Sequence, residues 1–314
     1  MAAHALYRRA IPAAARITRW HAPDGWAHRR FDWPAAPGRR QRGAMLFQVG
    51  RGDVFEKYLE SFAHWRARGW SITSFDWRGQ GGSGRLTDDP HCGHIESFDA
   101  YVDDLAAFVA EWRAENAGPH VLVGHSMGGH LVLRGLAEGR VAADAAVLVA
   151  PMLGLKAPIG PRFGERAARL LAALGRPTRR AWGSNERPFT RAARQSLLTG
   201  DRERYEDELW WLGANPDTRT GPPSWRWVVD AFRSTRELAE SPALARLSVP
   251  VQLLVAERDA LVDPRAALAV AERLGRATLV RFGPEARHEL LRETDAVRDR
   301  AIHAIDTFLD DALA

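Results

Sequence analysis

The 314-residue sequence has a single cysteine, Cys92, and lacks any long apolar run. One cysteine excludes an internal disulfide and a metal cage built from several thiolates, and it is typical of a reducing compartment. No segment approaches the uncharged run of about 18 residues that a membrane-spanning helix needs. The N-terminal segment carries arginines but no apolar core of a signal peptide. The sequence therefore predicts a cytoplasmic protein, with peripheral contact at the inner membrane face left open.

Lysine is scarce as well, because the 44 basic residues are nearly all arginines, and the formal net charge is +5. A basic balance can indicate nucleic acid or an anionic membrane as a partner. Here the arginines are scattered among 39 acidic residues, and no nucleic-acid-binding motif is present. We therefore expect no nucleic-acid partner. Apolar residues make up 46% of the chain, enough for a sizeable buried core.

Apolar runs alternate with amphipathic segments along most of the chain. A first hairpin is predicted over 16–21 and 28–33. The other predicted strands are 44–49, 71–77, 120–125, 145–150, 251–256 and 277–282, and the predicted helices are 54–69, 98–112, 127–138, 264–275 and a last one from about 289. Alternation of helices with continuously apolar strands predicts the α/β class, with a mostly parallel central sheet and helices on both faces.

Residues 151–243 interrupt this alternation with helical segments and turn-rich pieces. We interpret them as a helical cap, or lid, inserted over the carboxyl ends of the strands, where α/β sheets keep their sites. The predicted domains are thus an α/β core, formed by 1–150 and 244–314, and a cap formed by 151–243.

The strand and helix around position 126 are joined by the motif Gly-His-Ser-Met-Gly. A Gly-x-Ser-x-Gly turn between a strand and a helix is the nucleophile elbow of serine hydrolases. Side chains two residues either side of the serine would collide with the crossing strand and helix, so glycine is needed at Gly124 and Gly128. The helix amides then point toward Ser126 and favour negative charge there. The alternative, a plain turn with a capping serine, explains this placement less well.

A nucleophilic serine needs a base that is held by an acid. In folds that carry the nucleophile elbow, the acid and the base both follow the serine in the chain. Glu257, Asp259 and Asp263 follow the next-to-last predicted strand. We choose Asp259 because it lies three residues past the strand, whereas Asp263 is explained as the N-cap before Pro264. His288, in the loop after the last strand, is the predicted base.

Two backbone amides are needed to bind the oxyanion of an acyl-transfer intermediate. The amide of Met127, directly after the serine, is one candidate. The amide of Arg51 is the other, because the loop QVGRGDVFEKY has two glycines that let its backbone approach a substrate closely. For the Arg51 side chain we favour a solvated position over a contact with an anionic headgroup.

The segments VGHSMGG, QVGRGDVFEKY and FDWRGQGGSGRLTDDPHCGHIESFDAYVDDLAAF resemble bacterial lysophospholipases of the α/β-hydrolase fold. They are also similar to monoacylglycerol lipases and to serine-aminopeptidase-like hydrolases. The resemblance runs from about residue 40 to 150 and from 248 to the C-terminus, and it is weak across the cap. Monoacylglycerol lipases carry His-Gly in the first loop, where this chain has Val49-Gly50, which favours the lysophospholipase branch.

The resemblance implies hydrolysis of a carboxylic ester, a lysophospholipid or monoacyl lipid, without metal or organic cofactor. Alternatives are a monoacylglycerol lipase, a general carboxylesterase, or an aminopeptidase of the proline iminopeptidase kind. A peptidase needs a cap carboxylate for the substrate's amine. The candidates are Glu203, Glu206, Asp207 and Glu208. A binding protein without activity is expected to lack a member of the triad, and none is missing.

Other patterns are interpreted as structural. GQGGSG at 79–84 is followed by a loop rather than by the helix that a dinucleotide site requires. His91, Cys92 and His94 lie too close in sequence to converge easily on one zinc ion. His125 is expected to be a packing residue. We therefore predict no cofactor and no metal.

The cap has two features with two interpretations each. The first is a helical face with arginines beside it, which fits either a lid on an anionic membrane or, as we favour, a helix packed on the protein's own core. It consists of Phe163, Ala167, Leu170, Leu171 and Leu174, with Arg162, Arg166 and Arg169 nearby. The second is a group of tryptophans that either lines an acyl pocket or fills the cap core. These are Trp210, Trp211, Trp225 and Trp227.

Overall fold

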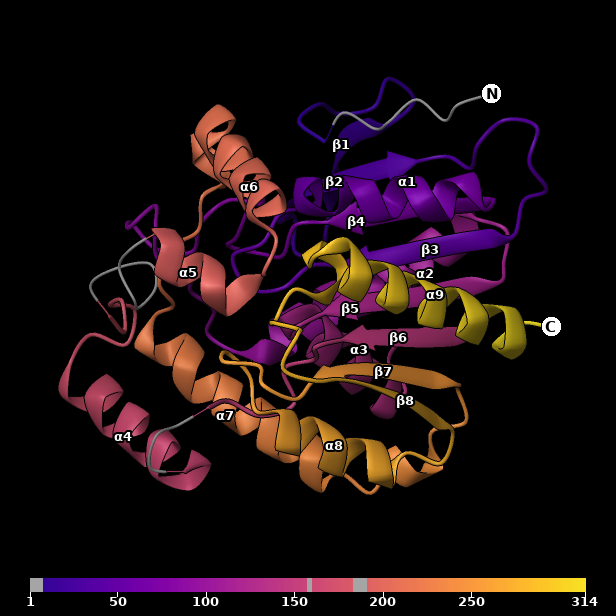
Figure 1. The fold of residues 1–314 in the computed structure, drawn as a ribbon. Helices are drawn as coiled ribbons and strands as arrows, with labels where there is room; N and C mark the ends of the chain where they lie inside the picture. The colour runs from indigo at the N-terminus through magenta and orange to yellow at the C-terminus, as the bar shows by residue number, and fades with distance from the viewer. Residues whose placement is uncertain (1–7, 157–159, 183–190) are drawn as a thin grey trace.

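The computed structural model describes residues 8–156, 160–182 and 191–314, and its centre is an eight-stranded sheet (Figure 1). The strand order is β1-β2-β4-β3-β5-β6-β7-β8. The strands are β1 (Arg16–His21), β2 (Ala27–Trp33), β3 (Gly43–Gln48), β4 (Trp70–Phe75), β5 (His120–His125), β6 (Ala145–Val149), β7 (Val251–Ala256) and β8 (Ala277–Phe282). All were predicted within two residues at each end.

The sheet is parallel from β4 to β8, and only β1 and β2 pair antiparallel with their neighbours. Every residue of β3, β5, β6 and β7 is buried, because helices cover both faces of the sheet. The predicted fold class is confirmed: a mostly parallel α/β sheet with helices on both faces.

In the described part of the chain, five helices pack against the sheet. They are α1 (Leu59–Ala67), α2 (Phe98–Glu115), α3 (Met127–Ala137), α8 (Pro264–Arg273) and α9 (Asp295–Ala312). Figure 1 shows α1 and α9 in front of the sheet and α2 and α3 behind it. The last helix begins later than the predicted position, about 289, because Leu290–Arg292 form a short 3-10 turn, η4, and Glu293 is extended. The predicted helix over 54–69 likewise begins as a 3-10 turn, η1 (Phe55–Tyr58).

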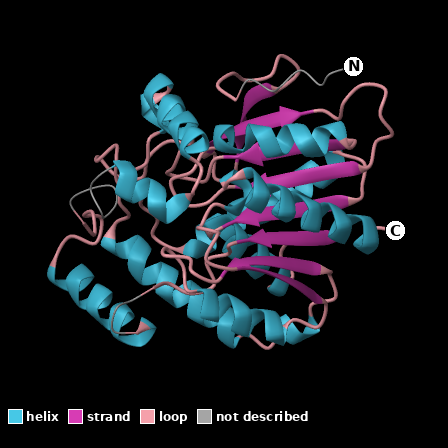
Figure 2. Ribbon diagram, in the orientation of Figure 1, coloured by secondary structure: helices cyan, strands magenta, loops and turns pink. Residues whose placement is uncertain are grey.

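Between β6 and β7, the residues that the structure describes form four helices: α4 (Pro161–Leu174), α5 (Arg191–Leu198), α6 (Arg202–Ala214) and α7 (Trp225–Glu240). Figure 2 shows them gathered at the end of the sheet to which the parallel strands point. This is the position expected for a cap. The division of the chain into two domains, with 151–243 as the second, stays a prediction.

The turn between β5 and α3 is tightly enclosed by backbone. A Cβ on Gly124 would lie 2.6 Å from the backbone of Gly128, and a Cβ on Gly128 would lie 2.4 Å from the carbonyl oxygen of Gln48. Real Cβ atoms do not approach backbone so closely, so both positions require glycine. Between them Ser126 has φ 52° and ψ −118°, a backbone conformation that residues other than glycine rarely adopt. The strained turn is therefore held by its surroundings.

We expect Gly128→Ala to lower the free energy of unfolding by about 2 to 3 kcal/mol, because the added methyl group meets the rigid end of β3. Urea denaturation measures this. Gly213→Ala is the matched control, since Gly213 is exposed on α6 with open space around its Cα. An equally small effect of both substitutions would contradict the steric account.

Candidate active site

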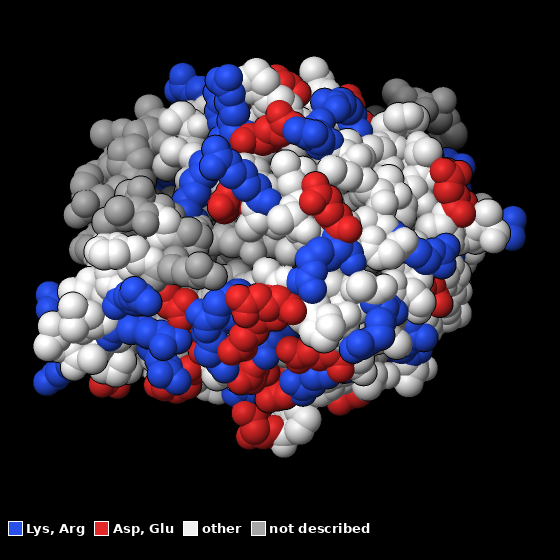
Figure 3. All heavy atoms as spheres, turned by 90° about the horizontal axis from the view of Figure 1, so that it is seen from below, with Lys and Arg blue, Asp and Glu red and all other residues white. Residues whose placement is uncertain are grey.

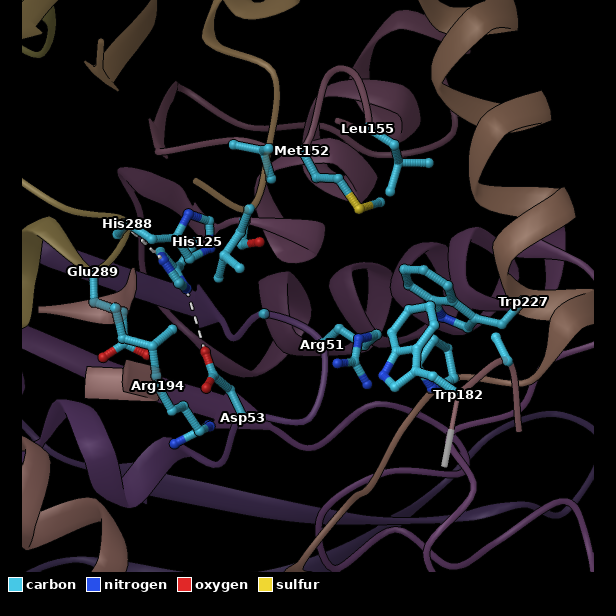
Figure 4. Close-up of a pocket in the computed structure, with 17 residues that line it drawn as sticks. Arg51, Asp53, His125, Met152, Leu155, Trp182, Arg194, Trp227, His288 and Glu289 are labelled. Carbon is cyan, nitrogen blue, oxygen red and sulfur yellow. Dashed lines mark hydrogen bonds and ion pairs between the residues drawn. The ribbon is translucent and has the colours of Figure 1, made fainter. Parts of the chain in front are cut away.

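A cavity of about 540 Å³ opens at the carboxyl ends of the strands, beneath the helices of 151–243. Ser126 and His288 both line it, as does Gly50 of the loop after β3 (Figure 4). Met152 and Trp227 contribute apolar walls. The structure thus brings the predicted nucleophile and the predicted base to one cavity, although 161 residues separate them in the sequence.

Three backbone hydrogen bonds hold Ser126 at the corner. Its amide donates to the carbonyl of Val149 at 3.0 Å, and its own carbonyl accepts from the amides of His130 at 3.1 Å and Met152 at 3.0 Å. The turn is therefore hydrogen-bonded to β6 and the segment after it, and also to the first turn of α3. Met127 is the first residue of α3, so its amide lies at the helix N-terminus, where the dipole favours negative charge.

His288 is bonded to Asp259. Its Nδ1 lies 2.5 Å from Oδ2 of Asp259, and both side chains are buried. The other carboxylate oxygen of Asp259 accepts the amides of Leu261 at 2.8 Å and Val262 at 3.1 Å. With Nδ1 donating its proton to the carboxylate, Nε2 of His288 is the nitrogen left to act as a base. The amides of Leu261 and Val262 thus hold the carboxylate of Asp259 in place, and this carboxylate in turn orients the imidazole ring of His288.

Burial and charge act in opposite directions on this pair. Burial lowers the pKa of His288, but the charge and hydrogen bond of Asp259, together with the charges of Glu289 and Asp53, outweigh burial and raise that pKa above its ordinary value. Burial raises the pKa of Asp259, but the charge and hydrogen bond of His288 and the backbone amides of Leu261 and Val262 together outweigh burial, so the pKa of this carboxyl is lowered. The pair therefore favours a charged carboxylate beside a proton-accepting imidazole.

The two other candidate acids do not reach His288. Asp263 caps α8 and accepts the amide of Arg265 at 3.0 Å, as its N-cap interpretation predicts. Glu257 is exposed and pairs with Arg281 at 2.5 Å. Of the three carboxylates that follow β7, Asp259 alone bonds the histidine.

The loop after β3 approaches Ser126 closely. A Cβ on Gly50 would lie 3.2 Å from the Cβ of Ser126, so the chain next to Arg51 passes beside the predicted nucleophile. The expectation of a solvated Arg51 side chain is wrong. Its guanidinium donates to the carbonyl of Gly221 at 2.9 Å and lies 5.7 Å over the ring of Trp227, so it contacts the segment 151–243.

Gln80 was missed by sequence reasoning. Its Oε1 accepts the amide of Gly52 at 2.6 Å, and its Nε2 donates to the hydroxyl of Tyr101 at 2.8 Å. The GQGGSG segment at 79–84 therefore supports the loop that carries Arg51. A glutamine between glycines was the available signal, but only the fold shows what it faces.

A buried ionic network next to the cavity was also missed. The ammonium of Lys57 lies 2.5 Å from Asp53, 2.6 Å from Glu289 and 3.0 Å from Glu208, and Arg292 lies 2.9 Å from Glu208 and also binds Glu289. Burial lowers the pKa of Lys57, but its three carboxylate neighbours outweigh that and raise it. The network joins the loop after β3, the residue after His288 and helix α6.

His125 was expected to be a packing residue, and it does pack: its ring centroid lies 4.8 Å from that of His288. It also takes part in hydrogen bonding. Its Nδ1 lies 2.9 Å from the hydroxyl of Tyr58 and 3.3 Å from Asp53, and its Nε2 lies 3.4 Å from the carbonyl oxygen of His288. His125 thus links the ionic network to the backbone of the predicted base.

The cap carboxylates proposed for a peptidase do not line the cavity. Glu203 and Glu206 are exposed on α6. Asp207 binds Arg8 at 2.5 Å and Arg9 at 2.6 Å, outside the cavity. Glu208 is buried in the ionic network.

Of the four tryptophans singled out in the sequence, Trp227 reaches the cavity, and Trp182, which was not singled out, lines it too. Trp211 is buried and donates to the carbonyl of Arg8, Trp225 is half-buried, and Trp210 is partly exposed. The acyl-pocket interpretation therefore fits Trp227 alone among the four.

Among the described residues, no group of three or more His, Cys, Asp or Glu side chains is arranged to hold a metal ion. His94 contacts Ser224 at 2.7 Å and Glu96 at 3.0 Å, while Cys92 is buried and donates to the carbonyl of Thr178. In the same part of the chain, no helix has the length and apolar character that crossing a membrane requires.

Known proteins resemble this chain in sequence and in fold. Lysophospholipase L2 of Escherichia coli (strain K12) is 34% identical over 291 residues, which cover 83% of this chain and 78% of that protein. A probable lysophospholipase L2 of Haemophilus influenzae is 28% identical over 291 residues, which cover 87% of this chain and 86% of that protein. A soluble variant of monoglyceride lipase from Saccharomyces cerevisiae shares the fold with a TM-score of 0.75, at 21% identity over 96% of both chains.

A family model described as serine aminopeptidase, S33, matches residues 39–295, which include the elbow, Asp259 and His288. The resemblance noted from the sequence motifs is confirmed by these matches. The chain therefore belongs to the α/β-hydrolase family of that description.

Proposed function

We propose that this protein is a serine hydrolase of lipid esters and, more narrowly, a lysophospholipase that releases a fatty acid from a lysophospholipid. The observation that carries the proposal is a single cavity lined by a serine on a strained elbow, by a histidine bonded to a buried aspartate, and by apolar side chains. The curated relatives named lysophospholipase L2 support the narrower substrate.

In this mechanism Ser126 attacks the ester carbonyl while Nε2 of His288 takes its proton, and Asp259 keeps the imidazole in the required tautomer. The amides of Met127 and Arg51 bind the oxyanion of the tetrahedral intermediate. His288 returns the proton to the leaving alcohol, and an acyl-enzyme forms. A water activated by the same histidine then releases the fatty acid and restores Ser126.

Two alternatives differ in substrate. A monoacylglycerol lipase or general carboxylesterase uses the same machinery, and the solved monoglyceride lipase fold is compatible with it. An aminopeptidase needs a carboxylate facing the substrate's amine. The carboxylates that do line the cavity, Asp53 and Glu289, are both bound to Lys57, which disfavours that role.

The first test is Ser126→Ala, for which we expect turnover of lysophosphatidylethanolamine to fall by about 10⁶, because the nucleophile is lost. Labelling by a fluorophosphonate probe should disappear in the same variant. Ser248→Ala, which changes an exposed serine, is the control and should keep both the turnover and the labelling of the unaltered protein. Labelling that persists without Ser126 would place the nucleophile elsewhere, and turnover of aminoacyl p-nitroanilides in preference to acyl esters would favour the peptidase.

A second test concerns the acid. Asp259→Asn should lower kcat by about 10⁴, since the amide favours the wrong histidine tautomer. Asp263→Asn is the matched control and should leave kcat nearly unchanged, because asparagine caps a helix as well as aspartate does. A large loss of kcat in Asp263→Asn but not in Asp259→Asn would assign the role of the acid to Asp263 instead.

The pH profile checks the same pair. His288 acts as a base only when neutral, so kcat/KM should rise with pH as it loses its proton, with a midpoint above the ordinary value of about 6.5. In Asp259→Asn the midpoint should fall, because the negative charge that raises the pKa of His288 is gone. A midpoint that does not move would contradict the assigned pairing.

We further propose that α4 contacts an anionic lipid surface. Its large apolar side chains face solvent, with Leu174 78% exposed, Leu170 58% and Phe163 54%, whereas Glu165 and Ala168 are buried. These exposures favour the lid interpretation over packing on the protein's own core. Exposed basic side chains accompany the apolar ones: Arg166, Arg169, Arg176 and Arg179. Figure 3 shows blue side chains around a white lobe at the left edge, where α4 lies in Figure 1.

We expect the protein to sediment with phosphatidylglycerol vesicles at low ionic strength and less well when salt is added, because charge attraction is screened. The double variant Leu170→Ser/Leu174→Ser should lose this binding. Leu279→Ser is the control, since Leu279 is partly exposed on β8, far from α4 in the chain. Failure to bind at low salt, or an equal loss in the control, would refute the contact.

A further inference from the structure

The cavity has two chemically different sides. Figure 4 shows Trp182 and Trp227 on one side, and Arg194, Asp53 and Glu289 on the other. A monoacyl lipid is itself divided in this way, into an apolar chain and a polar headgroup. The aromatic side suits the chain, because it offers large apolar surfaces that cost little to desolvate.

The charge on the polar side depends on Arg194. On this side three carboxylates, those of Asp53, Glu208 and Glu289, face two deeply buried cations, Lys57 and Arg292. The side chains of Lys57 and Arg292 are only 2% and 3% exposed, and neither lines the cavity. Among the described residues, these carboxylates outnumber the buried cations by one, so without a further cation this side would carry a net negative charge and would repel an anion.

Arg194, on α5, supplies that cation. Its guanidinium donates to Glu208 at 2.7 Å, and its side chain is 20% exposed and lines the cavity. Among the described residues, Arg194 is thus the cation of the network that neutralises the excess carboxylate and also lines the cavity. A planar guanidinium also matches the geometry of phosphate oxygens, to which it can donate two parallel hydrogen bonds.

We infer that Arg194 binds the phosphate of the substrate headgroup while the acyl chain extends toward Trp182 and Trp227. This inference rests on the proposed lysophospholipase function and names the residue that selects a phospholipid over a monoacylglycerol, which has no phosphate. Recognition is assigned to the phosphate rather than to a headgroup amine, because Asp53 and Glu289 each already bind Lys57.

The other arginine of the cavity is less suited to this role. Arg51 lies on the aromatic side, where its guanidinium binds the carbonyl of Gly221 and stands over Trp227. A phosphate bound there would occupy the surface that suits the acyl chain. Arg51 is therefore the competing candidate against which Arg194 is tested.

The experiment compares kcat/KM for lysophosphatidylethanolamine and for the monoacylglycerol of the same acyl chain. The ratio of the two values should fall at least about tenfold in Arg194→Gln, since charge-assisted hydrogen bonds to phosphate are lost, and should partly recover in Arg194→Lys. A general disturbance of the fold would lower both values and leave the ratio in place. Arg202→Gln removes an equal charge from an 81% exposed side chain on α6 and should leave the ratio unchanged.

An unchanged ratio in Arg194→Gln, or a fall confined to Arg51→Gln, would overturn the inference. A second arm uses hydrolysis of a short p-nitrophenyl ester, which requires no phosphate. Glycerophosphoethanolamine should inhibit this reaction competitively in the unaltered enzyme and about tenfold less strongly in Arg194→Gln. Equal inhibition by inorganic phosphate would instead indicate a site for free phosphate and would refute headgroup recognition.

The two arms separate this inference from the proposed function. If the enzyme hydrolyses monoacylglycerols but no lysophospholipid, the lysophospholipase proposal fails, and the inhibition arm still decides whether Arg194 binds a phosphate diester. If both lipids are hydrolysed and inhibition is independent of Arg194, the function stands and the inference is wrong.

Discussion

Strand β5 and helix α3 meet at a turn whose neighbours leave no room for a side chain two residues before or after Ser126. The carbonyl oxygen of Gln48 would lie 2.4 Å from a Cβ on Gly128, so the end of β3 and the start of α3 touch backbone to backbone. This contact forces the serine into its positive-φ conformation and turns it toward the cavity. The loop after β3 is brought to Ser126 by the same contact, because it continues directly from Gln48.

Near that turn the protein buries several charged side chains, which need partners of opposite charge. Isolated ions in a protein interior cost several kcal/mol each, and they are tolerated only when they are paired and hydrogen-bonded. Lys57 meets this condition by binding three carboxylates that come from the loop after β3, from α6 and from the residue after His288. A structural consequence is that helix α6 and the histidine loop share one set of ion pairs, so their positions are coupled.

The cavity combines these two constraints. Its reacting end is defined by backbone packing and by the bond between Asp259 and His288, whereas its polar side is defined by the ion pairs and by Arg194. Its aromatic side comes from Trp182 and Trp227, which belong to the segment 151–243. In the proposed function, the reacting residues thus lie on the sheet and its loops, and the contacts that distinguish one ester from another come largely from the inserted helices.

The sequence by itself determined the sheet and the elbow, because continuous apolar runs and a Gly-x-Ser-x-Gly turn are local patterns with few structural solutions. It also determined the choice of Asp259 over Asp263, since the N-cap before Pro264 is a local signal that the structure bears out at Asp263. The roles of Ser126, Asp259 and His288 in catalysis stay predictions. The resemblance to α/β-hydrolases was visible in motifs at the turn between β5 and α3 and in the segments that follow β3 and β4. Loops and turns are where function constrains residues more than packing does.

Only the tertiary structure decided the rest. Lys57, Glu208 and Glu289 are far apart in the sequence, and no local pattern shows that their charges meet. Arg51 was expected in solvent because an arginine in a loop is usually exposed, yet Gly221 and Trp227 lie beside it. The face of α4 had two interpretations for the same reason: amphipathic spacing says that one side is apolar but not what covers it. Burial and ion pairing are relations between distant segments, so they follow from the folded chain and not from periodicity.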